Sequence, residues 1–186
     1  MRDEFLEIYS SSGKKTGKKA TKSYIHKNGL FHATVHIWIF SEKGNVLIQK
    51  RSTKKKLNPG VWDVSVAGHI EYNEDIQAAA IRETFEETGL NVKEKDLFKL
   101  GIYSSVSNHC KIIDKEFYHT FILKIDEDKI NLNYKNDEVD DLKLISLGEM
   151  DFLLNQNNRD IFIGKNKNYY KDVFEAIYKI TKENYQ

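Results

Sequence analysis

The sequence is poor in cysteine and proline and has no long apolar segment. Its 186 residues include one cysteine and one proline. Cys110 therefore has no partner for an intramolecular disulfide, and the first residues, MRDEFLEIYS, lack the basic and apolar regions of a secretory signal. No segment approaches the roughly 20 apolar residues that a membrane-spanning helix needs. These absences exclude a disulfide scaffold and a bilayer span, and they favour a reducing, cytoplasmic compartment.

Neither sign of charge is in excess. The chain has 29 basic and 28 acidic side chains, so its formal net charge is +1. No global field would attract a nucleic acid polymer or a membrane, and we expect neither as a partner. With 40% hydrophobic and 12% aromatic residues, the chain can bury a substantial core. We therefore expect one globular domain over residues 1–186, and the sequence leaves a homodimer open.

Local patterns in the first third of the chain predict strands. Residues 5–30 predict a hairpin in which FLEIY and SYIH flank a solvated turn rich in Lys, Ser and Gly. Residues 33–40 and 46–51 are β-branched or apolar on either side of a turn-forming segment, so we expect a strand pair. The segment VWDVSVAG predicts a third strand that ends on Gly68.

The rest of the chain adds helices. Residues 75–88 lack Gly and Pro and repeat apolar residues at helical spacing, and Gly89 follows as a natural helix end. Strand-like segments follow at 97–106, 116–125 and 142–147, before an amphipathic C-terminal helix that carries Val173 and Ile177. Strands and helices without a regular alternation predict an α/β sandwich, a mixed sheet with helices on its faces.

Three carboxylates lie close together on the predicted helix. Glu83, Glu86 and Glu87 are separated by three and four residues, so they project from one helix face and repel one another. Hard oxygen ligands at this density suit Mg²⁺ or Mn²⁺, which can bridge diphosphate oxygens. Arg82, four residues before Glu86, could orient that carboxylate. The alternatives are a solvated acidic face and an ordinary surface ion pair.

A longer motif surrounds these carboxylates. The stretch GHIEYNEDIQAAAIRETFEETGL, residues 68–90, fits the pattern G-x5-E-x7-R-E-U-x-E-E-x-G-U and resembles a Nudix box. Its one departure is Thr84 at a position that is usually aliphatic. The resemblance implies a Nudix-like α/β/α sandwich with a mixed sheet. It also implies a catalytic loop–helix–loop that binds a divalent metal and a substrate diphosphate, with Gly68 and Gly89 serving backbone geometry at its ends.

The same resemblance implies an activity and roles for single residues. Most Nudix proteins hydrolyse the diphosphate bond of a nucleoside diphosphate linked to another moiety. Glu83, Glu86 and Glu87 would then hold Mg²⁺ or Mn²⁺, and Glu86 and Glu87 would share the activation of water. Arg82 and Gly68 would orient this group. Glu138, in an acidic segment before a predicted strand, is a second candidate for the base, and a solvated loop carboxylate is the alternative.

Residues outside the box extend the resemblance to about 7–150. The segments YIHKNGLFHATVHIWIF and LIQKRSTKKKLNPGVWDVSVAGH resemble the Nudix branch that includes type 1 isopentenyl-diphosphate isomerase. Arg51 and Lys55 match a basic pair of this branch, and a guanidinium with a nearby ammonium suits the oxygens of a substrate diphosphate.

The isomerase supplies the rival interpretation. Its metal is held by histidines and glutamates, and residues of these types fall at similar places here: His26, His32, His69 and Glu116, with Asp114 nearby. We take His32, His69 and Glu116 as secondary metal candidates, since a hydrogen-bonded, partly buried histidine is the common alternative. The isomerase also has a cysteine directly before its Gly-His pair, where this chain has Ala67. The hydrolase is therefore favoured, and the isomerase or a non-catalytic nucleotide-binding module is the alternative.

Overall fold

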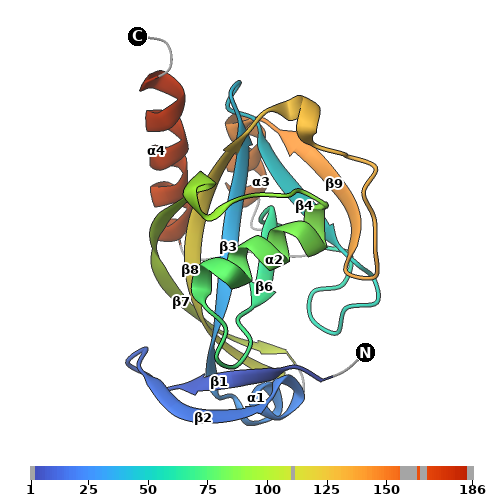
Figure 1. Ribbon diagram of the computed structural model, residues 1–186. Helices are drawn as coiled ribbons and strands as arrows, with labels where there is room; N and C mark the ends of the chain where they lie inside the picture. Colours follow the sequence, from blue (N-terminus) through green and yellow to red (C-terminus); the bar gives the residue numbers. More distant parts are fainter. Residues whose placement is uncertain (1–2, 110–111, 156–162, 164–166, 184–186) are drawn as a thin grey trace.

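The computed structural model describes residues 3–109, 112–155, 163 and 167–183, and its elements form three layers (Figure 1). The strands are β1 (Phe5–Tyr9), β2 (Lys15–Thr21), β3 (Phe31–Ser41), β4 (Val46–Arg51), β5 (Trp62–Asp63), β6 (Val66–His69), β7 (Leu97–His109), β8 (Ile112–Ile125) and β9 (Val139–Ile145). The helices are α1 (Lys22–Asn28), α2 (Ile76–Thr88), α3 (Leu147–Asn155) and α4 (Lys167–Glu183), with 3-10 turns at Glu94–Asp96 and Glu127–Lys129. Helix α2 crosses one face of the sheet, and α3 and α4 cover the other face.

Strand β3 is the centre of the sheet. It pairs in parallel with β8 along its whole length, and on its other side it pairs antiparallel with β6 and, at its end, with β4. The sheet is therefore mixed, and the predicted α/β sandwich is confirmed. Among the described residues, β3 and β4 share the single register pair Phe40 and Val46, and β4 pairs mainly with β9.

Each face of the sheet has its own core. Side chains alternate between the faces of a strand, and on β3 this alternation sends Val35 and Ile37 toward Ala79 of α2. Trp38, the residue after Ile37, points the opposite way and packs with Val173 of α4 on the other face. All of these side chains are buried. The two cores hold α2 and α4 against opposite faces of the sheet.

Helix α2 lies where the sequence predicts it. Asp75 precedes its first turn, and the Asp75 side chain accepts hydrogen bonds from the backbone N–H groups of Gln77 and Ala78. Gly89 follows the last turn with φ of 74°, in the left-handed region, where glycine has no steric penalty. Both ends of the helix thus follow from local sequence.

Two predictions about the first third of the chain are wrong. The return strand of the N-terminal hairpin is the lysine-rich β2, and the segment SYIH belongs to helix α1 instead. Thr21 caps α1 by accepting from the backbone N–H of Tyr24, and Gly29 ends it at φ of 58°. The strand predicted over VWDVSVAG is also divided, because β5 pairs with β4 whereas β6 pairs with β3.

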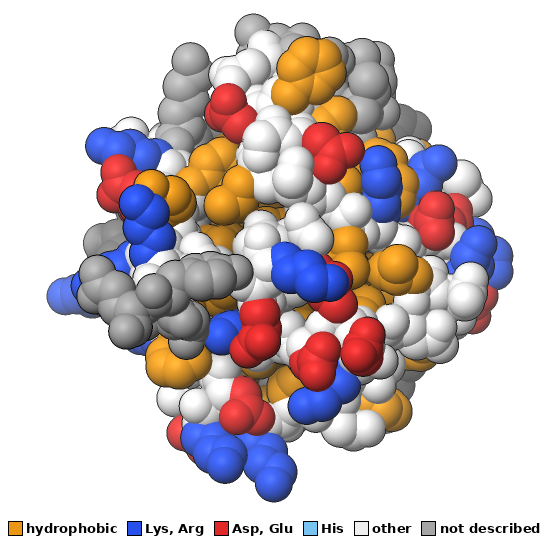
Figure 2. Space-filling model, turned by 90° about the horizontal axis from the view of Figure 1, so that it is seen from above, with side chains coloured by type: hydrophobic (Ala, Val, Ile, Leu, Met, Phe, Trp, Pro, Cys, Tyr) orange, Lys and Arg blue, Asp and Glu red, His pale blue; other side chains and the backbone are white. Residues whose placement is uncertain are grey.

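The surface mixes both signs of charge. In Figure 2 acidic and basic side chains are interspersed over the face shown, as the nearly neutral net charge predicts. Within the described ranges, no helix is both long enough and apolar enough to cross a bilayer. Cys110 lies outside the described residues.

Candidate active site

Glu83 and Glu87 lie against the backbone of β6 and Arg82 joins Glu83 to Glu86, and we call the three glutamates the acidic cluster. Glu83 and Glu87 are 7% and 1% exposed, whereas the Glu86 side chain is 52% exposed. The Oε2 atom of Glu87 accepts hydrogen bonds from Gln49 Nε2 at 2.5 Å and from the backbone N–H of Ala67 at 2.8 Å. Its Oε1 atom is buried and has no hydrogen-bond partner among the described residues. One oxygen is thus fixed by the protein, and the other can receive a ligand.

Arg82 is the main counter-charge of the acidic cluster. Its Nη1 donates to Glu83 Oε1 at 2.7 Å and to Glu86 Oε2 at 3.0 Å. Its Nε and Nη2 each donate to Glu74 at 2.8 Å, and Nη2 also donates to the carbonyl of His69 at 2.9 Å. The guanidinium thereby fixes two members of the cluster relative to the β6 backbone, which is the geometry that an orienting residue needs.

Gly68 leaves room for a glutamate. A Cβ atom at this position would lie 1.9 Å from the carboxyl carbon of Glu83 and 2.1 Å from its Oε2, far inside van der Waals contact. The φ angle of Gly68 is not in the left-handed region, so the absence of a side chain is what matters. Gly68 therefore lets the Glu83 carboxylate lie directly on the backbone of β6.

Burial of like charges perturbs the titration of the cluster. Burial, followed by the charge of Glu87, raises the pKa of Glu83 to about 8 although Arg82 opposes the shift. Burial also raises the pKa of Glu87, with Lys55 as the largest opposing influence. Two adjacent buried carboxylates are therefore costly to ionise together, and a cation beside them would remove that cost. These residues fit a divalent metal.

Lys55 connects the cluster to the candidate base Glu138. Its Nζ lies 2.5 Å from Glu138 Oε2 and 3.8 Å from Glu87 Oε1. Burial raises the pKa of Glu138, but the charge and the hydrogen bond of Lys55 outweigh it, so this pKa lies below its ordinary value. Glu138 is thus ionised at neutral pH and can accept a proton. Arg51 lies nearby, but its guanidinium already donates to Asp63 and to the carbonyl of Leu57.

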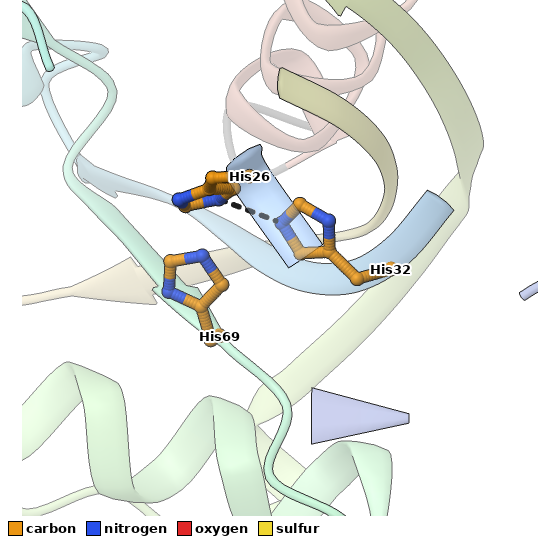
Figure 3. A group of neighbouring side chains, drawn as sticks. All are labelled: His26, His32 and His69. Atoms are coloured by element: carbon orange, nitrogen blue, oxygen red, sulfur yellow. Dashed lines mark hydrogen bonds between the residues drawn. The ribbon is translucent and has the colours of Figure 1, made fainter. Parts of the chain in front are cut away.

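A second group lies on the other side of β6. His26 from α1, His32 from β3 and His69 from β6 point their rings toward one another, and we call them the histidine cluster (Figure 3). Each offers a nitrogen within 4.8 Å of the others, and the Nε2 atoms of His26 and His32 are 3.4 Å apart. Asp114 Oδ1 lies 3.5 Å from His26 Nε2, and Glu116 Oε1 lies 4.0 Å from His32 Nε2. Of the secondary metal candidates, His32 and His69 thus lie in one group with His26, and His32 and Glu116 lie in another with Asp114.

Burial keeps the histidine cluster neutral. It lowers the pKa of His26 and of His32 to about 4 and that of His69 well below its ordinary value. Neutral imidazoles are the form that binds metals. His69 Nε2 is buried and lacks a hydrogen-bond partner among the described residues, while its Nδ1 lies 3.7 Å from Glu4 Oε2. Imidazole nitrogens with carboxylates suit borderline transition metals better than Mg²⁺.

Sequence reasoning missed several side chains that shape the site. Gln49 holds Glu87, Glu4 reaches His69, and the charge of Lys22 acts on both His69 and Glu138. Tyr134 and Asn136 donate to the carbonyl of Glu86. Most of these partners are tens of residues apart in the chain, so no local spacing pattern could have indicated them.

Comparison with known proteins agrees with this architecture. The family model of the NUDIX domain matches residues 30–163. An uncharacterised Nudix hydrolase of Clostridium acetobutylicum is 30% identical over 204 residues, covering 95% of this chain and 98% of that protein. An isopentenyl-diphosphate delta-isomerase of Photorhabdus laumondii is 34% identical over 161 residues, covering 86% of each chain. A crystal structure of a Deinococcus radiodurans protein matches the fold with a TM-score of 0.63 at 17% identity, covering 95% of this chain and 98% of that one.

Proposed function

We propose that this chain, which belongs to the NUDIX domain family, hydrolyses the diphosphate bond of a nucleoside diphosphate, free or linked to another moiety. Nudix enzymes generally use divalent metals, and the acidic cluster is the site that we assign to the catalytic one. The observation that carries the proposal is the buried pair Glu83 and Glu87, whose joint ionisation calls for a cation. The Oε1 atom of Glu87 also has no hydrogen-bond partner among the residues that the structure describes. We take the catalytic unit to be one domain over residues 1–186.

The ligand atoms favour a hard cation. Glu83, Glu86 and Glu87 offer only carboxylate oxygens, which suit Mg²⁺ or Mn²⁺. Such an ion, when bound, supplies charge neutralisation at the diphosphate oxygens and lowers the pKa of the attacking water.

The residues of the chain divide the remaining work. Arg82 and Gly68 hold Glu83 and Glu86 in place, and Gln49 with the Ala67 N–H group orients Glu87. The Lys55 ammonium binds substrate diphosphate oxygens and also keeps Glu138 ionised, and Arg51 adds a second positive charge beside them. We assign the acceptance of the water proton to Glu138, because this carboxylate is partly exposed and lies outside the cluster that the cation would occupy.

A substrate panel tests the proposal. Nucleoside diphosphates, nucleoside triphosphates, nucleotide sugars and dinucleotides, each incubated with Mg²⁺ and with Mn²⁺, should include a substrate that yields orthophosphate or nucleotide products. Addition of EDTA should stop the reaction. Failure of the whole panel with both metals would contradict the proposed hydrolysis, and tight metal-dependent nucleotide binding without product would favour a non-catalytic binding module.

One observation favours a second candidate function, the isomerisation of isopentenyl diphosphate. The histidine cluster with Asp114 and Glu116 resembles the metal ligands of that isomerase, and the Photorhabdus relative carries its name. Ala67 opposes this candidate, because it offers only a methyl group where the isomerase has its cysteine. Proton NMR of isopentenyl diphosphate should therefore show no dimethylallyl diphosphate after long incubation with the protein and Mg²⁺ or Mn²⁺.

A further inference from the structure

The C-terminal end of α2 is held by two side chains of the loop that precedes β9. The last carbonyls of a helix have no partner within the helix. Here the carbonyl of Glu86 accepts from Asn136 Nδ2 at 2.5 Å and from Tyr134 Oη at 3.0 Å. The two contacts join residues that are 48 and 50 positions apart in the sequence, and both end on the backbone of a member of the acidic cluster.

The other end of the Asn136 amide fixes the residue that carries the candidate base. Asn136 Oδ1 accepts from the backbone N–H groups of Glu138 at 2.7 Å and of Val139 at 2.9 Å. The backbone N–H of Asn136 donates to the carbonyl of Val139 at 3.0 Å, which closes the turn. One side chain therefore joins the helix of the metal-binding carboxylates to the turn of Glu138.

Tyr134 and Gly89 add a second attachment between these elements. A Cβ atom at Gly89 would lie 2.8 Å from Tyr134 Cε2 and 2.9 Å from its Cδ2, so the ring packs directly on the glycine backbone. The glycine that ends α2 thus also admits the Tyr134 ring, whose hydroxyl reaches the Glu86 carbonyl.

We propose that Asn136 is a positioning residue for catalysis, which sets the place of the Glu138 carboxylate relative to the acidic cluster. The proposal rests on the hydrolysis proposed above and on Glu138 as proton acceptor. Two groups that must act on one substrate need a fixed separation, and a displacement of about 1 Å can cost on the order of a hundredfold in rate. Asn136 meets neither substrate nor metal in this role, because it acts through the backbone on either side.

The Asn136 amide donates to the Glu86 carbonyl and accepts from the turn of Glu138, and three variants separate these two functions. Asn136→Ala removes both, whereas Asn136→Asp keeps the acceptor of the turn and replaces the donor by an oxygen that repels the Glu86 carbonyl. Asn131→Ala is the matched control, since Asn131 Oδ1 accepts from the backbone N–H of Asn133 in the same loop at 3.1 Å. Among the described residues, no hydrogen bond joins the Asn131 side chain to α2.

The kinetic test is a double-mutant cycle with Glu138. We expect Asn136→Ala and Asn136→Asp to lower kcat by about tenfold or more with little change in KM, and Asn131→Ala to leave both unchanged. In a Glu138→Gln background, Asn136→Ala should have almost no further effect on kcat, because the group that it positions is already disabled. Multiplicative effects of the two substitutions would overturn the proposal, and so would normal turnover of Glu138→Gln.

Hydrogen exchange keeps the proposal separable from the proposed hydrolysis. In Asn136→Ala the amides of residues 136–142 should exchange at least about tenfold faster than in the unsubstituted protein, whereas Asn131→Ala should leave them unchanged. Equal exchange in the two variants would overturn the attachment even if the protein hydrolyses diphosphates. Loss of Mg²⁺-dependent turnover in Glu87→Gln, together with an inert Asn136→Ala, would support the hydrolysis and reject only the positioning role.

Discussion

The acidic cluster and the histidine cluster lie on either side of β6 and respond to burial in opposite directions. Burial raises the pKa of Glu83 and lowers that of His32, so each group is driven toward its neutral form. A neutral imidazole is a complete ligand, whereas a protonated carboxyl is not. A bound cation therefore stabilises the ionised carboxylates most, while the neutral histidines are stable without one. Clustering of possible ligands alone does not identify the catalytic metal site.

The two clusters share one short strand. The Ala67 N–H group binds Glu87, Gly68 lies against Glu83, and the His69 ring belongs to the histidine cluster. A substitution in β6 can act on either cluster. Variants must therefore be compared in matched pairs, one in each cluster.

The largest expected contrast is between Glu87→Gln and His69→Gln. Glu87→Gln keeps size and helix propensity but removes the charge of a proposed metal ligand, so turnover with Mg²⁺ should fall by several orders of magnitude. His69→Gln should lower it by less than about tenfold. The melting temperature of Glu87→Gln in EDTA should stay the same or rise, because the substitution removes a buried carboxylate whose Oε1 has no hydrogen-bond partner in the described part of the chain. The opposite ranking of turnover would move the catalytic metal to the histidine cluster.

A substitution at Gly68, in the strand that the clusters share, should disturb the acidic cluster alone. Gly68→Ala places a methyl group on the Glu83 carboxylate, so we expect turnover to fall by on the order of a hundredfold. Overpacking should also lower the free energy of unfolding by about 1–3 kcal/mol. Gly148→Ala in α3 is the control, since among the described residues its Cβ would meet only Ser146 Oγ, at 3.9 Å, and turnover should not change. Normal turnover of Gly68→Ala would show that the position of Glu83 is unimportant.

The smallest expected effect is a pH-dependent difference in stability without metal. Glu83 titrates near 4.5 when unfolded and at about 8 when folded, so its contribution to stability is lost as pH rises through this window. His32 titrates near 6.5 when unfolded and at about 4 when folded, so its contribution is lost as pH falls through that window.

Two variants reveal these opposite signs in EDTA. The melting temperature of Glu83→Gln minus that of the unsubstituted protein should increase from pH 5 to pH 8. The same difference for His32→Gln should increase from pH 7 to pH 4.5. If the melting temperature of either variant changes with pH in parallel with that of the unsubstituted protein, the substituted group does not change its proton affinity on folding.

The sequence was sufficient for the elements whose signals are local. Helix α2 is predicted by its periodicity, by Asp75 at its start and by Gly89 at its end. Strands β3 and β8 follow from runs of β-branched and aromatic residues. Helix α1 was missed because seven residues carry little periodicity, and the break between β5 and β6 was missed because it reflects a change of partner strand.

The candidate site was predictable only in its residue types. The spacing of Glu83, Glu86 and Glu87 places them on one face, but it does not indicate that Glu83 and Glu87 are buried while Glu86 is half exposed. The contacts of Lys55 with Glu138 and of Asn136 with Glu86 depend on how β4 and β9 pair. Tertiary pairing, and not local pattern, therefore sets the geometry that catalysis requires.

The most direct test of the acidic cluster as the catalytic metal site is the dependence of turnover on Mn²⁺ concentration. The concentration for half-maximal turnover should rise by at least about tenfold in Glu86→Gln and stay unchanged in His32→Gln, with both variants folded as judged by their melting temperatures. An unchanged Mn²⁺ requirement in Glu86→Gln together with an increased one in His32→Gln would contradict this assignment.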